Sequence, residues 1–439
     1  MEILHTSAST VPRWHLMTCA YERMQRRQTI AKADKVPNKF NKVYCVIQYG
    51  RNHNKLSHPE CVERIQTIER ALTDSRLLCD GGQCSSSSRN VEAPGGDISS
   101  ATAVQLLSPS GRVPSAAELG LVHSTAYISK MFEISNTIQE PTLIDDSTYI
   151  SPGSIQSVLE GLGAALDLAD KIMGSPTCTG NQDVATSVTM GKNLPCSQSS
   201  VENTFVPHPR ESNSTTTAML SSYNNWHAGH YPNYEHPAGF AIIRPPGHHV
   251  LPNRPMGFGL INTISILARY CQCVHKRQRI LIFDFDVHHG NGTMEIFYED
   301  ADVMYISTHQ EGLWPYTGKV SNVGQGKGLG TTINIPLPGG SGDMAMRAVF
   351  DQVLGPAAEA FQPEVILVSA GYDSHKLDPL ACMNLKTSSF GWMSHELSLL
   401  AHKHCEGRLI FILEGGYHLP SLADSVVASL KGLLHDSKC

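Results

Sequence analysis

The chain has 439 residues, 41% of them hydrophobic, which is enough for one large α/β domain or two of average size. Charged residues make up 17% and the net charge is −6, so the composition lacks the basic excess typical of nucleic-acid-binding proteins. No apolar run approaches the length of a bilayer span, and the 12 cysteines form no CxxC pair. We therefore expect a soluble intracellular protein with no direct nucleic-acid or membrane partner. The composition does not indicate an oligomeric state.

Residues 1–41 show no sustained periodicity and are interpreted as an N-terminal extension. Basic side chains outnumber acidic ones in this stretch, a pattern that fits an organellar transit peptide and a disordered tail about equally well. The expected location is therefore the cytoplasm or nucleus, or a plastid or mitochondrion if the extension is a transit peptide.

The folded part is expected to begin at Lys42, with a strand over 43–48. A helix opened by Pro59 should follow and end near Leu78, and another helix is expected over 155–173. We interpret two polar, low-complexity stretches as insertions into a single domain spanning 42–439: about 81–100 and about 174–235.

Four short apolar runs recur in the second half of the chain, each followed by polar, reactive residues. The runs cover 240–243, 280–283, 365–368 and 409–413, with helical patterns near 262–274, 344–361, 393–405 and 421–434. Strands that alternate with helices predict a parallel sheet covered by helices on both faces. In such sheets ligands bind at the carboxyl ends of the strands, so we expect the four polar segments to meet in one pocket.

The run at 280–283 is followed by acidic and imidazole side chains at alternate positions: Asp284, Asp286 and His288. Burying such groups without partners is costly. Carboxylate with neutral imidazole suits a divalent transition metal, most often zinc. A simple Asp–His hydrogen-bond network is the better interpretation for any one of these residues, but the cluster as a whole favours a metal. If Asp286, His288 and Asp373 bind zinc, three protein ligands leave an open position, as in catalytic sites.

A hydrolytic zinc site also needs a proton carrier and a donor for the developing oxyanion. The tandem His248 and His249 can carry the proton, and Tyr417, which follows two glycines, can donate to the oxyanion. Asp284 and Asn291 are expected to orient one histidine each. Singly, such residues are more often surface, packing or capping groups, and only their joint occurrence at strand ends favours catalysis.

Several long motifs, in one order, are similar to those of the zinc-dependent histone deacetylase family. They are RPPGHH, DFDVHHGNGT, STHQEG, SAGYDSHKLDPLA and LEGGYH. The resemblance is class II-like, especially to the plant and bacterial-type branch that includes acetylpolyamine amidohydrolases, and covers about 42 to the C-terminus apart from the insertions. It implies a three-layer α/β/α arginase/deacetylase-like fold with a mainly parallel sheet, and hydrolysis of N-acetyl-lysine in histone or non-histone proteins.

The resemblance also implies roles for individual residues. Asp286, His288 and Asp373 match the zinc ligands, His249 the main acid–base residue, and Tyr417 the oxyanion donor. His248 with Asp284 matches an electrostatic partner, and Arg64 a pocket-floor arginine. Five residues match a family site for a structural potassium ion: Asp284, Asp286, His288, Ser307 and Thr308.

The substrate channel is expected to involve the Gly257-Phe258 pair, Trp314 and Leu380. Gly259 stands where the family often has cysteine, and Trp314-Pro315-Tyr316 replaces a usual aromatic-Pro-Gly, which leaves the channel width open. Leu380 occupies a gatekeeper position where an acidic residue would favour polyamines, so acetyl-lysine in proteins is preferred. A deacylase of small acetylated amines, such as polyamines or arylalkylamines, and a non-catalytic scaffold on the same fold remain as alternatives.

Overall fold

The computed structural model describes residues 40, 42–78, 103–174 and 237–434. These residues form an eight-stranded sheet in which every neighbouring pair of strands is parallel. In sheet order the strands are β2 (Ala103–Leu106), β1 (Lys42–Gln48), β5 (Ala238–Ile243), β10 (Leu409–Leu413), β9 (Val365–Ala370), β6 (Ile280–Asp284), β7 (Val303–Gln310) and β8 (Thr332–Leu337). The predicted parallel sheet is confirmed.

The four apolar runs form four adjacent strands in the middle of this sheet: β5, β10, β9 and β6. Their side chains alternate between two hydrophobic cores because successive residues of a strand point to opposite faces. In β6, Leu281 and Phe283 belong to one core, whereas Ile280 and Ile282 belong to the other. Both faces are therefore buried, which explains why these strands are continuously apolar.

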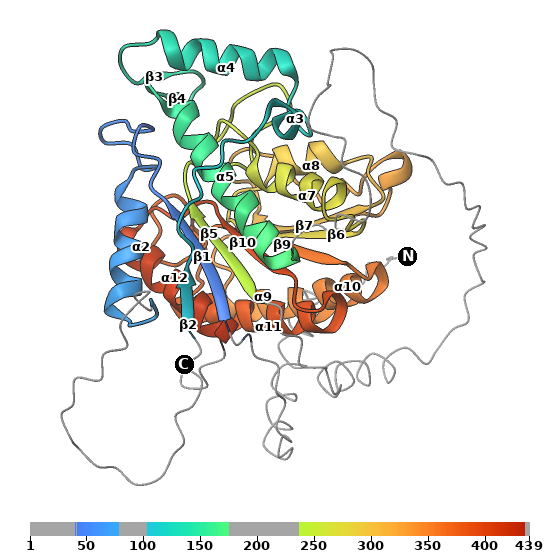
Figure 1. Cartoon of the computed structure of the whole chain (residues 1–439). Coiled ribbons are helices and arrows are strands. Elements are labelled where there is room, and N and C mark those ends of the chain that lie inside the picture. The colour runs from blue at the N-terminus through green and yellow to red at the C-terminus, as the bar shows by residue number, and fades with distance from the viewer. Residues whose placement is uncertain (1–39, 41, 79–102, 175–236, 435–439) are drawn as a thin grey trace, which may run out of the picture. The chain divides into compact units, whose positions relative to one another are not determined.

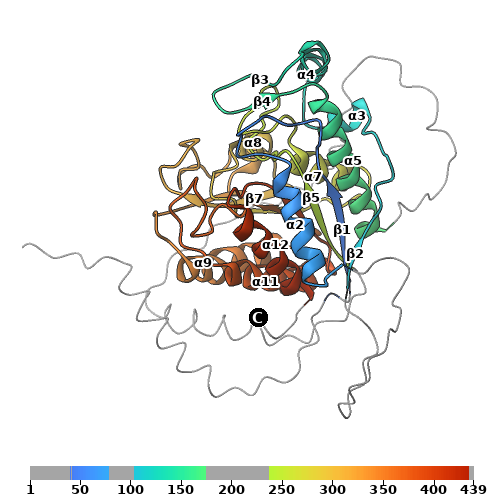
Figure 2. The same cartoon turned by 90° about the vertical axis from the view of Figure 1, so that its left-hand side faces the viewer.

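Helices cover the two faces of the sheet, giving three layers (Figure 1). One core is completed by α2 (Glu63–Asp74), α9 (Asp343–Val349), the π-turn η2 (Phe350–Leu354), α10 (Gly355–Phe361), α11 (Thr387–Cys405) and α12 (Leu419–Leu434). The other is completed by α3 (Ala116–Leu119), α4 (Thr125–Thr137), α5 (Ser154–Met173), α7 (Thr263–Cys273) and α8 (Asn291–Phe297). Figure 2 shows α2, α11 and α12 on one side of the strands and α5 and α7 on the other. The remaining elements are a short hairpin, β3 (Thr142–Leu143) with β4 (Tyr149–Ile150), and a 3₁₀ turn, η1 (Gly326–Gly328).

The helix expected to open at Pro59 begins four residues later, at Glu63, and ends at Asp74 rather than near Leu78. The prediction was wrong because Glu60 is not a helix-surface residue. Its carboxylate is buried and bonded to Arg244, which holds the chain before Glu63 in a non-helical turn.

The predicted extension and both predicted insertions lie outside the described residues, except for Phe40 and Gly174. Those domain boundaries remain predictions. Within the described ranges, no helix combines the length and the apolar character that crossing a membrane requires.

Candidate active site

Three candidate metal ligands come together at the carboxyl ends of two adjacent strands. Asp286 and His288 follow β6, and Asp373 follows β9. One donor atom from each lies within 4.8 Å of the other two. His288 Nδ1 is 3.2 Å from Asp286 Oδ1 and 3.1 Å from Asp373 Oδ2. The three donor atoms are therefore close enough to bind one ion.

The chemistry of this donor set fits a divalent cation. Asp286 and Asp373 are both buried, and burial together with the neighbouring Asp286 raises the pKa of Asp373 to about 7. Two glycines leave room for the carboxylates, since a Cβ on Gly371 would lie 2.0 Å from Asp286 Oδ2 and one on Gly415 would lie 2.1 Å from Asp373 Oδ2. A cation between the two carboxylates would relieve their repulsion, and two carboxylates with one imidazole suit zinc.

The tandem histidines lie beside this centre, with their ring centroids 4.0 Å apart. His248 Nδ1 lies 3.0 Å from Asp284 Oδ2, which also accepts a bond from the Tyr305 hydroxyl at 2.9 Å. His249 Nδ1 lies 2.9 Å from Asn291 Oδ1. Because an ionised carboxylate and an amide oxygen only accept, Nδ1 is the donor in both contacts. The Nε2 of His249 is then free to accept a proton.

The two histidines have opposite electrostatic surroundings. Burial by itself would lower the pKa of His248, but the carboxylates of Asp284 and Asp286 raise it to about 10. Burial lowers the pKa of His249 well below its ordinary value, and the nearby His248 and His288 lower it further. His248 is therefore the charged member of the pair and His249 the neutral one, which is the form of a general base.

Tyr417 lies on the loop after β10 and is held through its backbone. Asp378 Oδ2 accepts hydrogen bonds from the amides of Tyr417 at 2.7 Å and His418 at 3.2 Å, and the amide of Gly415 donates to Asp286 Oδ2 at 2.8 Å. Burial raises the pKa of Tyr417 well above its ordinary value, so its hydroxyl stays protonated and can donate. Sequence reasoning missed Asp378, although an acid in the loop after a strand was a usable signal.

A buried network of charged side chains holds the backbone of the loop that carries Tyr417. Arg64 donates to the carbonyl oxygens of Gly416 at 2.8 Å and Glu414 at 2.5 Å, and its guanidinium lies 5.0 Å from the Tyr417 ring centroid. Glu60 accepts from Arg244 Nε at 2.7 Å and Nη2 at 2.5 Å and lies 3.5 Å from Arg64 Nη1. The network joins the β1–α2 loop to the loops that carry the histidines and Tyr417.

Replacing Glu60 with Gln should lower the free energy of unfolding at pH 7 by about 3–5 kcal/mol, because two buried guanidinium groups lose their counter-charge. Burial by itself would raise the pKa of Glu60, but Arg244 above all, and then His53 and Arg64, lower it from 4.5 to about 2. The carboxylate therefore stabilises the fold above pH 4.5, and this contribution is lost as the pH falls towards 2. Urea midpoints of the two proteins should differ at pH 7 and converge in that acid window. Glu140→Gln, at an exposed position, is the control; equal midpoints for Glu60→Gln and wild type at pH 7 would contradict the prediction.

The aromatic residues expected to line the channel lie against different parts of the centre. The Trp314 ring is edge-on to His249, with centroids 4.7 Å apart, and lies 6.2 Å from His288. The Phe258 ring is edge-on to Tyr417 at 5.6 Å. Both are only partly buried. They therefore stand beside the expected acid–base residue and the expected oxyanion donor.

Three small or apolar positions near the expected channel lie against other loops of the site. A Cβ on Gly257 would lie 2.2 Å from His249 Cδ2, so the backbone there rests directly on the imidazole. A Cβ on Gly259 would lie 2.5 Å from the Pro246 carbonyl oxygen, so a cysteine there would require the backbone to shift. The Leu380 amide donates to Asp378 Oδ1 at 3.0 Å. Leu380 therefore lies next to the carboxylate that holds the loop carrying Tyr417, called the tyrosine loop below. Tyr316 is 73% exposed.

Ser307 and Thr308 belong to β7, where Ser307 pairs in register with Asp284 of β6. Ser307 Oγ is 3.0 Å from His309 Nδ1. Thr308 Oγ1 is buried and has no hydrogen-bond partner within the described part of the chain. The potassium ion expected at these residues remains a prediction.

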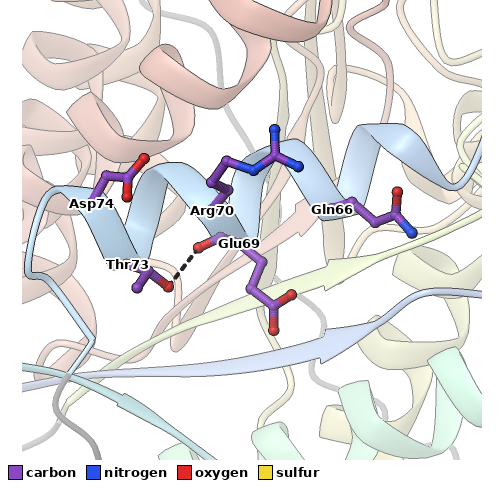
Figure 3. Close-up of a pocket in the computed structure, with 5 residues that line it drawn as sticks. All are labelled: Gln66, Glu69, Arg70, Thr73 and Asp74. Carbon is purple, nitrogen blue, oxygen red and sulfur yellow. Dashed lines mark hydrogen bonds between the residues drawn. The ribbon is translucent and has the colours of Figure 1, made fainter.

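A groove on α2 shares no residue with this centre. It is lined by Gln66, Glu69, Arg70, Thr73 and Asp74 (Figure 3). The only hydrogen bond drawn within it runs from Thr73 Oγ1 to the Glu69 carbonyl oxygen at 3.0 Å. Its residues are mostly exposed, whereas Arg64 of the same helix is buried behind Tyr417. The groove contains no predicted site residue.

A three-layer fold with a carboxylate–imidazole cluster at the carboxyl edge of a parallel sheet defines a candidate metallohydrolase. Residues 58–433 match the histone deacetylase domain. The chain is 36% identical over 412 residues to "Histone deacetylase 10, chloroplastic" of Oryza sativa subsp. japonica, covering 93% of this chain and 76% of that protein. It is 36% identical to "Histone deacetylase 14, chloroplastic" of Arabidopsis thaliana, covering 87% and 74%.

The crystal structure of the HDA15 HD domain superposes with a TM-score of 0.66 at 25% identity, covering 91% of this chain and 89% of that one. The chain therefore belongs to the histone deacetylase family and has its arginase-like α/β/α fold, as the motifs predicted. Family membership makes it a hydrolase of acetyl amides.

Proposed function

We propose that the protein hydrolyses the acetyl amide of N-acetyl-lysine in a protein or peptide substrate, using a divalent ion, zinc by preference, held by Asp286, His288 and Asp373. The observation that carries this proposal is the meeting of three donor atoms within 4.8 Å beside the hydrogen-bonded histidine pair. An ion bound there would polarise the acetyl carbonyl and lower the pKa of a water molecule.

The side chains around this point have complementary roles in the proposed reaction. His249 Nε2 takes a proton from the attacking water and later gives a proton to the leaving amine nitrogen as the carbon–nitrogen bond breaks. Asn291 holds the His249 ring through Nδ1, and Asp284 balances the charge of His248. The Tyr417 hydroxyl donates to the acetyl oxygen as negative charge develops on it. Trp314 and Phe258 exclude water beside the acyl group.

The proposal is tested by side-by-side rates on an acetyl-lysine peptide and on acetylspermidine, with metal analysis of the same sample. We expect zinc at one equivalent and faster turnover of the peptide. Faster turnover of the free amine would favour a small-molecule deacylase, which shares every catalytic residue. Bound zinc without turnover of any acylated amine would favour a scaffold.

Leu380 should contribute to this preference, because an apolar side chain beside the tyrosine loop gives no counter-charge to a polyamine. Replacing Leu380 with Glu should raise kcat/KM for acetylspermidine relative to the peptide by about tenfold, the effect of one partly screened ion pair. Leu380→Gln, whose side chain has the shape of Glu without the charge, is the matched control. An unchanged ratio in the Glu variant would contradict a gatekeeper role.

We also propose a plastid location, which the names of the rice and Arabidopsis relatives carry for those proteins. The basic, acid-poor composition of residues 1–41 is compatible with a transit peptide. A fluorescent fusion to the C-terminus of the full chain tests this proposal. Cytosolic or nuclear fluorescence would contradict it.

A further inference from the structure

Glu414 is a buried carboxylate that none of the roles above uses. It follows β10 and is 1% exposed. Its Oε2 accepts hydrogen bonds from the backbone amides of Gly247 at 2.7 Å and His248 at 3.2 Å. Its Oε1 accepts from Ser369 Oγ at 3.3 Å. A carboxylate is costly to bury unless it is hydrogen-bonded, and bonds from amides to a carboxylate are among the strong ones.

The loop that these amides belong to is confined on its other sides as well. A Cβ on Gly247 would lie 2.6 Å from the Ile261 carbonyl oxygen and 2.9 Å from the Thr263 amide nitrogen. The His248 carbonyl oxygen accepts from the Thr293 amide at 3.0 Å. Glu414 adds a further contact to this loop, which carries His248 and His249 and is called the histidine loop below.

The main chain of Glu414 begins the loop that carries Tyr417. Its carbonyl oxygen accepts from Arg64 at 2.5 Å, and the next amide, that of Gly415, donates to Asp286. The backbone of this residue is thus attached to the tyrosine loop, while its side chain holds the histidine loop, whose residues lie more than 160 positions earlier in the chain.

We propose that Glu414 is a positioning residue that sets the place of His249 relative to Tyr417. Its side-chain hydrogen bonds run to the backbone of the histidine loop and to Ser369, and none of them runs to Asp286, His288 or Asp373. The inference rests on the proposed function for the roles of His249 and Tyr417. The role requires a hydrogen-bond acceptor at the position of Glu414 Oε2, and it does not require a charge. A neutral side chain with an oxygen at that position should therefore perform the same role.

Two neutral variants of nearly equal length separate this role from simple filling of space. Glu414→Gln keeps an oxygen that can accept from both amides, whereas Glu414→Met keeps the length and has no oxygen. On the acetyl-lysine peptide, the Gln variant should retain a kcat close to wild type. The Met variant should lose about 100-fold in kcat through displacement of the histidine loop, with KM and metal content unchanged. Equal rates in the two variants would overturn the proposal.

A third variant, Glu414→Asp, keeps the charge and shortens the reach by one methylene, so it should behave like Met. An active Asp variant beside an inactive Gln variant would mean that charge, not position, is required, and would also overturn the proposal. If the Met variant does not fold, the kcat values of the Gln and Asp variants decide between position and charge.

The wild-type assay distinguishes failure of this proposal from failure of the proposed function. If wild type does not hydrolyse the peptide, crystal structures of the Gln and Met variants decide the positioning role. The separation of the His249 imidazole and the Tyr417 hydroxyl should match wild type in the Gln variant and differ in the Met variant. An unchanged separation in both would refute it.

Discussion

Replacing Asp373 with Asn should abolish stoichiometric metal binding and lower kcat/KM on an acetyl-lysine peptide by more than about 1000-fold. The amide has the shape of the carboxylate, and its oxygen can still accept from the Val287 amide, which donates to Asp373 Oδ1 at 2.9 Å. What the variant loses is one negative charge and one anionic donor beside Asp286 and His288. Metal content by elemental analysis and initial rates on the same preparation measure both effects.

The matched control is Asp74→Asn, which makes the same chemical change at an exposed position on α2. It should bind metal and turn over substrate as the wild type does. The Asp373 variant should also melt at or above the temperature of metal-free wild type, because removing one of two adjacent buried carboxylates relieves their repulsion. Full activity or full metal content in Asp373→Asn would remove Asp373 from the proposed ligand set.

Replacing Tyr417 with Phe should lower kcat by about 100- to 1000-fold while metal content and KM stay close to wild type. The ring is retained, so its edge-on contact with Phe258 and its position near the Arg64 guanidinium are preserved. Only the hydroxyl proton is lost, and a donor to a developing oxyanion contributes more in the transition state than in the bound substrate.

Tyr298→Phe, at the end of α8 and half-exposed, controls for loss of a tyrosine hydroxyl. An unchanged kcat in Tyr417→Phe would refute the oxyanion role. A rise in KM with unchanged kcat would instead make the hydroxyl a group that binds substrate and transition state equally.

The main strands were predictable from sequence because each is buried on both faces and therefore reads as an apolar run. The runs at 280–283 and 409–413 correspond to β6 (Ile280–Asp284) and β10 (Leu409–Leu413). β7 (Val303–Gln310) was not identified, because its apolar first half leads directly into the polar Ser307-Thr308-His309. The start of α2 was misplaced because the partner of Glu60, Arg244, lies 184 residues away.

The same reason explains which candidate site residues could be singled out from the sequence. Asp286, His288, Asp373 and Tyr417 were singled out because each closely follows an apolar run. Asp378 and Glu414 follow such runs too, but their hydrogen bonds run to backbone amides of other loops, and an amide has no sequence signature. The strand-end acid in Leu413-Glu414-Gly415 was the available signal, and it was used only as part of a family motif.

The sequence by itself determined the class of fold and the family and indicated the candidate reactive side chains, since burial on both faces dictates apolar strands and chemistry dictates residue type. The tertiary structure decided that β5, β10, β9 and β6 are neighbours, and hence that their end loops meet at one edge. It also decided how those loops are held, through the carboxylates of Glu60, Asp378 and Glu414. Strand order and backbone hydrogen bonds depend on contacts between residues far apart in the chain, which local periodicity does not encode.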